Sequence, residues 1–433
     1  MARDLCAARR SGLRSAPVGE GIGVANRRQL NGHYDQAATM LGVPGAGHFE
    51  PADLEPGLSD RLGDLDVNRA VIDRKLVHFK KPSVRWKETL TRLARAGKFR
   101  CVLNAAALEL IVAENGSTVE ELIVGRQGST LSIRADVFVV CAGALETPRL
   151  LLNSRRRLAH GIGNAHDLVG RYLLDHPIGH YCKLRFHRST RAPLYASLPL
   201  AGNVGMMAGL MLAPEQQRQR RLANHYVWIR PSVSAARIDD ELLLSFLAVR
   251  SARDLSARQV IAILTNRDIA YRILVHRFGI RPKFKFGDLF FMIEQLPNPD
   301  SRVGLSNRRD EYGYQVVSVN WQLLERDIDG FLEYAKVLFE HGLRSEQHTL
   351  ARVDDPSIWN RTLASAAHHL GTARMAASPQ HGVVDRNLQV FGMSNLFVCD
   401  GSVFATAGSV NRSLTITALG IRLAEHLVSS QAA

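Results

Sequence analysis

The sequence LFVCDGS at residues 396–402 decides the fold of this chain. Its short apolar run ends in an aspartate and a glycine, a pattern typical of the carboxyl end of a buried strand. A histidine motif, HHLGTARM at residues 368–375, precedes it, and a helix with apolar side chains at helical spacing opens at residues 411–413 (NRS). A base, a carboxylate at a strand end and a helix N-terminus together predict a site for a polar, partly anionic ligand.

The composition indicates an ordinary globular protein with two structural lobes. The chain has 433 residues, of which 46% are hydrophobic and 22% charged, enough for a substantial core. Lys and Arg (55) exceed Asp and Glu (41), giving a formal charge of +14. A positive field favours nucleic acid or anionic surfaces. The basic residues are scattered, however, without zinc-finger spacing or a ribonucleoprotein motif, so we expect no nucleic-acid partner.

The cysteines and the apolar runs restrict the location of the protein. The five cysteines are far apart, with no CxxC pair, so neither a disulfide framework nor a zinc site is expected, and no other metal. Cys141 and Cys399 lie in apolar patterns and are expected to be buried. No run is long enough to cross a bilayer. We therefore expect a cytoplasmic protein without an integral membrane segment.

Residues 1–29 are set apart by their basic, acid-poor composition. Such a start can be a transit peptide, but a disordered tail or an artefact of a misplaced start fits the lack of apolar periodicity better. The sequence GEGIG at residues 19–23 superficially matches a dinucleotide-binding glycine loop. No buried strand precedes it, and a strand, a tight turn and a helix are needed to hold a pyrophosphate. We therefore interpret this segment as a loop.

The rest of the chain alternates strand and helix patterns. The continuous apolar run at residues 135–141 (ADVFVVC) suits a strand buried on both faces of a parallel sheet, with a helix beginning after it. Asn115-Gly116 is a hairpin signal between two strand patterns. Further helices are predicted near residues 34–41, 86–96 and 331–338, and further strands at residues 99–103, 106–112, 119–124, 290–294 and 315–321.

Four motifs follow one another in a characteristic order. They are AGALETP at residues 142–148, VGRYLLDHP at residues 169–177, PNPDSRV at residues 297–303 and the C-terminal set above. Together they resemble the glucose–methanol–choline (GMC) family of flavin-dependent oxidoreductases, over roughly residues 85–180 and 290–430. The resemblance implies an α/β fold with an α+β substrate lobe, that is, a Rossmann-like FAD/NAD(P)-binding GMC fold, here N-terminally truncated because the family's GxGxxG segment is missing.

The resemblance also implies an arrangement of domains and ligand-binding residues. After the tail at 1–29, residues 30–180 form the remaining part of the FAD-binding lobe, 181–355 the substrate-binding lobe, and 356–433 the segment that completes the FAD lobe and the active site. The residues expected to bind FAD are Ala107, Ala142, Gly143, Asp400, Gly401, Ser413 and Leu414. For Asp400 an N-cap or Asx-turn role is the alternative. For the turn at 142–143 the alternative is tight packing between strand and helix.

The catalytic residues implied by the family are His368 and Asn411. Oxidation of an alcohol requires a base for the hydroxyl proton while hydride moves to flavin N5, and a neutral imidazole meets this need near neutral pH. His368 is the expected base and Asn411 its partner across the substrate hydroxyl. His176, in the Asp-His-Pro motif, is interpreted as structural. The family usually has proline after the asparagine, where this chain has Arg412.

The predicted function is therefore an FAD-dependent oxidoreductase acting on the CH–OH group of a small alcohol, sugar or polyol. The alternative is a catalytically silent truncated remnant, or a subunit that needs a separate nucleotide-binding half. Neither the alcohol nor the electron acceptor has a diagnostic motif in the sequence.

Overall fold

The computed structural model of the protein describes residues 27–45, 67–80, 84, 86–190, 198–199, 204–234, 255–271, 283–343, 348–351 and 363–431. The glycine-containing segment at residues 19–23 lies outside these residues. Two hydrophobic cores organise the described part of the chain, one around a large antiparallel sheet and one around a short parallel strand pair.

The large sheet has its main strands in the order β1-β8-β9-β10-β6-β13, while β7 pairs with β8 and β14 with β6. The pairing is antiparallel throughout, with Ile72 opposite Leu212 at the start of β1. The strand bounds are β1 Ile72–Lys80, β6 Pro177–Thr190, β7 Leu198–Pro199, β8 Val204–Leu212, β9 Tyr226–Ser232, β10 Phe284–Met292, β13 His348–Ala351 and β14 Ala364–Ser365.

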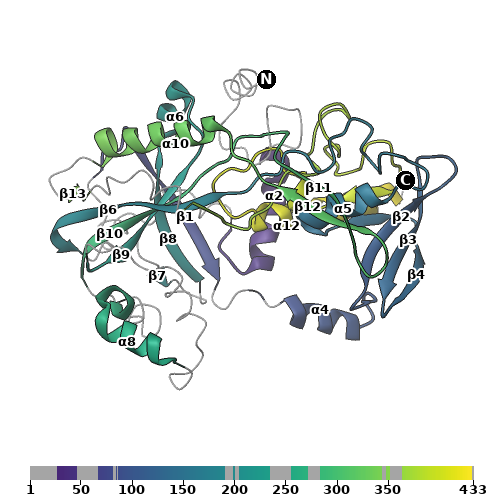
Figure 1. Cartoon of the computed structure of the whole chain (residues 1–433), viewed down its shortest axis with the longest axis horizontal. Coiled ribbons are helices and arrows are strands. Elements are labelled where there is room, and N and C mark those ends of the chain that lie inside the picture. The colour runs from purple at the N-terminus through teal and green to yellow at the C-terminus, as the bar shows by residue number, and fades with distance from the viewer. Residues whose placement is uncertain are drawn as a thin grey trace.

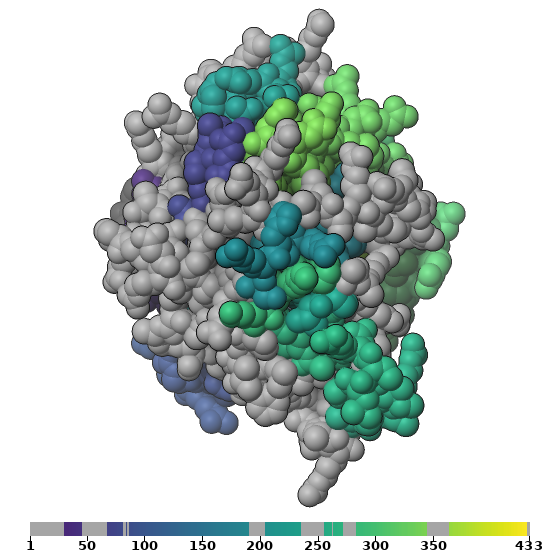
Figure 2. All heavy atoms as spheres, turned by 90° about the vertical axis from the view of Figure 1, so that its left-hand side faces the viewer, coloured from purple at the N-terminus to yellow at the C-terminus, as the bar shows by residue number. Residues whose placement is uncertain are grey.

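One face of this sheet is covered by helix α10 (Glu325–Val337). Alternate side chains of β9 and β10, among them Val227 and Phe291, pack with Phe331 and Tyr334 of the helix. Helices α6 (Pro214–Arg220) and α8 (Ala257–Thr265) lie further out, at opposite edges of this side of the molecule (Figure 2). The intervening side chains of β9 and β10, among them Trp228 and Phe290, point to the other face of the sheet, away from α10.

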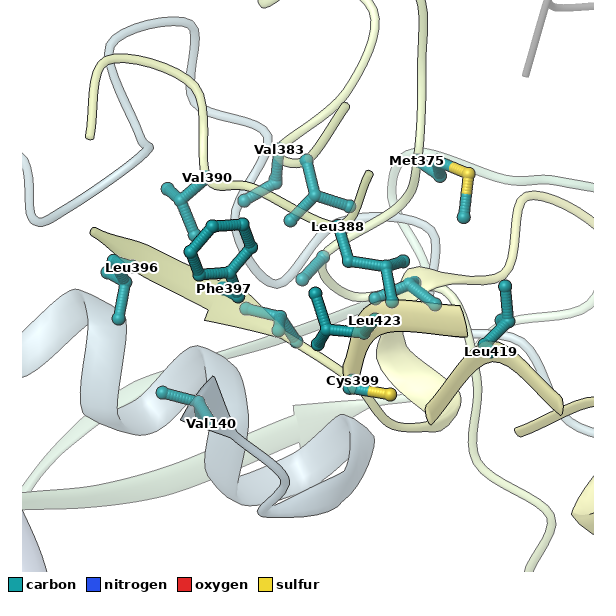
Figure 3. Packing of buried hydrophobic residues seen from close by; sticks show 14 of the residues in the cluster. Val140, Met375, Val383, Leu388, Val390, Leu396, Phe397, Cys399, Leu419 and Leu423 are labelled. Atoms are coloured by element: carbon teal, nitrogen blue, oxygen red, sulfur yellow. The ribbon is translucent and has the colours of Figure 1, made fainter. Parts of the chain in front are cut away.

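The second core surrounds a parallel pair formed by β5 (Phe138–Val140) and β15 (Leu396–Val398). Helix α12 (Ser413–Gln431) packs Leu419 and Leu423 against Cys399, next to this pair (Figure 3). The other elements are α2 Arg27–Leu41, α4 Trp86–Arg95, α5 Gly143–Asn153, the antiparallel sheet β2 Ala106–Val112, β3 Val119–Arg126 and β4 Ser129–Arg134, and the hairpin β11 Arg302–Arg309 and β12 Gln315–Asn320. Figure 1 shows α2 and α12 between the large sheet and β2–β4.

Several expectations about local structure are confirmed and others are wrong. The strands at 138–140 and 396–398, the helix after residue 142 and the hairpin at Gly116 occur as predicted, and the two strands pair with each other in parallel. The strand expected at residues 99–103 does not form, and Leu103 is 70% exposed. Helix α4 forms but buries no side chain. β5 was expected to be buried on both faces, yet Val139 is 43% exposed and Cys141 is also exposed, because among the described residues only one face of β5 is covered.

The overall class agrees with the prediction of a mixed α/β protein. The proposed domain boundaries remain a prediction, although β1, which falls within the segment 30–180, pairs with β8 of the large sheet. Within the described residues, no helix combines the length and the apolar character needed to span a membrane.

Candidate active site

The carboxyl ends of β5 and β15 lie side by side and bring Gly143 and Asp400 together. The Asp400 carboxylate accepts hydrogen bonds from the backbone N–H of Gly143 (2.8 Å) and the hydroxyl of Thr147 (2.6 Å). Its other oxygen accepts from the N–H of Ser402 (2.7 Å), at the start of a 3-10 turn over Gly401–Val403. Asp400 therefore caps both the start of α5 and the Gly401–Val403 turn, and N-capping is the alternative role that the sequence allowed for it. A contact to a flavin ribityl chain remains a prediction.

The backbone at Gly143 leaves open space in front of α5. Gly143 has a φ of +79°, which favours glycine, and a side chain added there would meet no heavy atom of the described residues within 4 Å. The preceding Ala142 is exposed. A tight-packing role therefore does not explain this glycine by itself, and a ligand can approach the backbone closely at this turn.

The histidine motif runs alongside the turn that follows β15. Gly371 donates its N–H to the carbonyl of Gly401 (3.2 Å), and Ala373 donates to that of Ser402 (2.9 Å). A side chain added to Gly401 would come within 2.8 Å of the His369 carbonyl oxygen. Glycine at 401 is therefore required for the two segments to lie in contact.

His368 is positioned through its backbone by Asp175. One oxygen of the Asp175 carboxylate accepts the His368 N–H (2.9 Å), and the other accepts the hydroxyl of Ser365. The imidazole itself is half-buried. Burial lowers the pKa of His368, an effect that His369 reinforces and Asp175 opposes. The ring is therefore mostly neutral at neutral pH, as a general base must be.

His176 lies directly against His368, which the sequence did not predict. The two ring planes stand at 78° to each other, with centroids 5.4 Å apart. His176 is fully buried, and its Nε2 lies 3.1 Å from the carbonyl oxygen of Val410, next to Asn411. Burial lowers the pKa of His176 to about 4, with the positive charge of Arg412 as the second cause. The Asp-His-Pro motif at residues 175–177 was the feature of the sequence that could have indicated this contact. Asp175 accepts the backbone N–H of His368, and the ring of His176 lies against the ring of His368.

Asn411, Ser413 and Leu414 stand at the start of α12. Asn411 and Ser413 are exposed and Leu414 is partly buried, so the first turn of the helix is accessible to a ligand. The first N–H groups of a helix have no partner within it and carry a partial positive charge. His176 links the start of α12 to His368. Its ring contacts the ring of His368, and its Nε2 contacts the carbonyl oxygen of Val410, the residue before Asn411.

Arg412 takes a structural position that proline could not. Its guanidinium is buried and donates to the carbonyls of Ala407 and Thr406 (3.3 Å for the latter), and it lies 5.1 Å from the centre of the Phe404 ring. Burial lowers the pKa of Arg412 to about 10, while Glu294 acts in the opposite direction. The loop before α12 is therefore held from inside by a cation.

The large sheet reaches the same loop. Lys75 of β1 donates to the hydroxyl of Ser409 (3.0 Å), and Glu294 accepts the N–H of Gly408 (3.2 Å). On the face away from α10, the ring of Trp228 lies 5.6 Å from that of Tyr226 and 4.7 Å from that of Phe290. An aromatic face thus adjoins the loop that carries Asn411.

Ala107 is the predicted ligand residue that lies in another sheet. It is exposed near the start of β2 and pairs with Val124 of β3. Its role toward the adenine remains a prediction. Within the described ranges, no group of three or more His, Cys, Asp or Glu side chains could hold a metal ion.

The strand ends fit one part of a flavin dinucleotide site. Such a ligand needs parallel strand ends with a small, open turn and a helix N-terminus, and all three are present here. In addition, the buried Nδ1 of His368 has no hydrogen-bond partner among the described residues. The described residues contain no strand followed by a phosphate-binding glycine loop, so they account for only part of the contacts that FAD requires.

Comparison with known proteins identifies the family. Two GMC oxidoreductase family models match the chain, one over residues 88–178 and one over residues 297–420. The chain belongs to the GMC oxidoreductase family. This confirms the resemblance found in the sequence, to a family whose models are described as GMC oxidoreductases.

Three curated relatives illustrate this membership. A 2-methyl-1,2-propanediol dehydrogenase of Mycolicibacterium austroafricanum is 27% identical over 74% of this chain and 53% of its own length. The fructose dehydrogenase large subunit of Gluconobacter japonicus is 23% identical over 68% of this chain and 47% of its own. A 6'''-hydroxyparomomycin C oxidase of Streptomyces lividus is 26% identical over 79% and 55%. This GMC chain therefore spans about half the length of the curated relatives it matches.

A solved structure shares the fold. Pyridoxine 4-oxidase from Mesorbium loti aligns over 93% of this chain and 77% of its own, with a TM-score of 0.53 and 18% identity. The likeness confirms the GMC fold expected from the sequence.

Proposed function

We propose that this GMC chain oxidises the CH–OH group of a small alcohol, sugar or polyol with FAD, and that His368 is the base. The observation that carries the proposal is the His368 imidazole. The backbone N–H of His368 is held by Asp175, the ring is kept neutral by burial, and the histidine motif packs along the turn after β15. A neutral, oriented imidazole beside a ligand-binding strand end supports a proton-accepting role.

The residues that would hold FAD lie on three elements. The backbone at Ala142 and Gly143 would approach the dinucleotide, Asp400 and Gly401 would lie beside it, and the N–H groups of Ser413 and Leu414 would face its negatively charged part. When bound, FAD supplies the hydride acceptor, N5 of its ring system.

Proton removal is the part of the reaction that falls to the chain's own side chains. The buried Nδ1 of His368 leaves Nε2, on the other side of the half-exposed ring, as the nitrogen that faces outward. Nε2 would take the hydroxyl proton while Asn411 orients the same oxygen. Neutral imidazole is required for this step, so activity should fall as the pH drops below the lowered pKa of His368.

The substrate class rests on the relatives and on the large sheet. The relatives' names specify 2-methyl-1,2-propanediol, fructose and 6'''-hydroxyparomomycin C, which all offer hydroxyl groups for oxidation. In this chain, Trp228 is partly exposed on the sheet face next to the loop that carries Asn411, and it packs against the buried rings of Tyr226 and Phe290, the latter covered by Arg230 at 3.7 Å. Such a face suits the apolar side of a sugar, a polyol or an aromatic alcohol.

Flavin titration tests the proposal. The purified chain is titrated with FAD while flavin fluorescence and visible absorbance are followed, and diols, sugars and aryl alcohols are then assayed with an electron-accepting dye. We expect binding, and turnover that falls by about 10²–10⁴-fold in His368→Gln with FAD binding retained. His160→Gln, an exposed histidine, is the matched control. A chain that binds no FAD, or a His368→Gln variant with near-normal turnover, contradicts the proposal.

The alternative of a silent remnant or a dependent subunit makes a different prediction in this titration. A chain that needs a separate nucleotide-binding half would gain FAD affinity only after that polypeptide is added. A remnant would gain none. The relationships to catalytic oxidases and dehydrogenases favour the enzyme.

A further inference from the structure

The contact between His176 and His368 leaves two buried nitrogens without partners. The Nδ1 atoms of both rings are buried and unbonded among the described residues. A buried polar nitrogen without a hydrogen bond is costly, so such a pair calls for an explanation. The site described above uses only the outward nitrogen of His368.

The hydrogen bond of His176 to Val410 fixes its tautomer. The Val410 carbonyl can only accept, so Nε2 of His176 must carry the proton at 3.1 Å. The pKa of about 4 keeps the ring neutral at physiological pH, because burial and the Arg412 charge outweigh Asp175. Nδ1 of His176 therefore carries no proton, and its lone pair is a buried hydrogen-bond acceptor.

The ring separation suits a bond between the two imidazoles. Ring atoms lie slightly more than 1 Å from a ring centre, so at a centroid distance of 5.4 Å two nitrogens that face each other along the line of centres would be roughly 3 Å apart, a normal hydrogen-bond distance. The interplanar angle of 78° is compatible, because the planes can intersect along the N–H···N line. The bond is not formed in the ring orientations of the structure, so its formation requires a turn of the His368 ring about its Cβ–Cγ bond.

The nearby carboxylate cannot take this role in the arrangement seen. The oxygens of Asp175 accept from the N–H groups of His176 (2.7 Å) and His368 (2.9 Å) and from the hydroxyl of Ser365. The carboxylate thus orients the backbone of both histidines. It makes no hydrogen bond to the His368 ring within the described residues.

We propose that His176 is a positioning residue that holds His368 in the Nδ1–H tautomer by accepting this proton at its own Nδ1, which keeps Nε2 of His368 bare toward the reacting hydroxyl. This inference rests on the proposed function and deepens it, since it says how the base is kept in its reactive form. A buried carboxylate or carbonyl commonly sets the tautomer of a catalytic histidine; here a neutral second histidine does so.

The test reads the tautomer directly in the chain, whether or not flavin is bound. Long-range ¹H–¹⁵N spectra of ¹⁵N-histidine-labelled protein distinguish Nδ1–H from Nε2–H rings, and the His368 signals are assigned by their loss in His368→Gln. His225 is an internal reference, because its Nδ1 accepts the Glu294 N–H and its proton is therefore on Nε2. In the unmodified chain we expect mainly Nδ1–H for His368 and Nε2–H for His176.

Three substitutions of His176 separate the tautomer effect from mere support of the fold. His176→Asn places an accepting oxygen near the Nδ1 position but loses the bond to Val410, whereas His176→Gln keeps a donor for Val410 and loses that acceptor. His176→Phe loses both. We expect the Nδ1–H fraction of His368 to fall at least twofold in the Gln and Phe variants and to be largely retained in Asn. If Phe does not fold, the Asn and Gln pair decides.

The outcomes separate this inference from the proposed function. An unchanged His368 tautomer in the Gln variant, or an Nε2–H form in the unmodified chain, overturns the inference even if the enzyme is active. The expected tautomers in a chain that binds no FAD would leave the inference standing and remove the proposed function. In flavin-loaded enzyme, the Gln variant should lower kcat about tenfold with KM within twofold, and Asn should restore most of it.

Discussion

Asp400 and Gly143 are joined by a 2.8 Å hydrogen bond across 257 residues of sequence. The bond connects the end of β15 with the first turn of α5, and the same carboxylate oxygen also binds the hydroxyl of Thr147. Because the two segments are far apart in the chain, the bond forms only when the parallel pair has assembled. The candidate cofactor residues therefore depend on the stability of this junction.

Replacement of Asp400 by alanine should destabilise the fold by about 3 kcal/mol. It removes a charged acceptor from three donors, and hydrogen bonds to charged groups contribute about 1.5–3 kcal/mol each without being additive. Urea denaturation followed by circular dichroism measures the change. Asp136→Ala, an exposed aspartate just before β5, should change the free energy of unfolding by less than about 0.5 kcal/mol. Equal effects of the two substitutions would show that the junction contributes little.

Gly143→Ala should separate backbone strain from ligand approach. The φ of +79° predicts a loss of about 1 kcal/mol in the free energy of unfolding, because the left-handed region disfavours a Cβ. Gly304→Ala, in β11, has neither a positive φ nor a neighbour within 4 Å and serves as control. If FAD approaches the turn, its dissociation constant should rise in Gly143→Ala alone. An unchanged FAD affinity would place the cofactor elsewhere.

Local sequence signals predicted most of the elements around the site. Asn115-Gly116 forms the hairpin, and the apolar run at 396–398 forms β15, since turn chemistry and hydrophobic pattern act within a few residues. The same signals do not identify which partner covers a surface. Leu90 follows helical spacing in α4 and is still 46% exposed, and Val139 lies on an uncovered face of β5.

The relation between the two histidines was beyond the reach of sequence reasoning. His176 precedes β6, and His368 follows β14, which pairs with β6 at Ile178 and Pro177. Antiparallel pairing places the two side chains together, but nothing in either segment specifies that partner. Lys75 likewise meets Ser409 only through the fold, across 334 residues. The family motifs located the base, whereas the residues that orient it required the tertiary structure.

Stability should depend on His176 at acidic pH. Its pKa is about 4 in the fold against 6.5 for an ordinary histidine, so below pH 6.5 the unfolded chain binds this proton first. The free energy of unfolding should therefore fall as the pH drops from about 6.5 to about 4, by roughly 3 kcal/mol for this group, with no contribution above pH 7. Urea titrations at half-unit pH steps measure this slope. His176→Phe should flatten it, and an identical slope in both proteins would contradict the burial of a neutral ring.

Arg412 should be essential to the loop before α12 despite being a charged residue in the interior. Replacement by proline, which the GMC pattern has here, would suit the start of the helix but leave the carbonyls of Thr406 and Ala407 unpaired. We expect Arg412→Pro and Arg412→Met to lower the free energy of unfolding by about 3 kcal/mol, against less than about 0.5 kcal/mol for the exposed Arg308→Met.

The cation also explains the glycine at 408, and this gives a sharper test. A side chain added to Gly408 would collide with the guanidinium of Arg412, and the φ of Gly408 is +61°. Gly408→Ala should therefore be strongly destabilising alone but less so in an Arg412→Met background, where the collision is gone and only backbone strain remains. A coupling of at least about 0.5 kcal/mol in the double-mutant cycle is expected, since contacting residues are not additive. Strict additivity would mean that Gly408 is required by its backbone conformation alone and that the guanidinium does not fill this space.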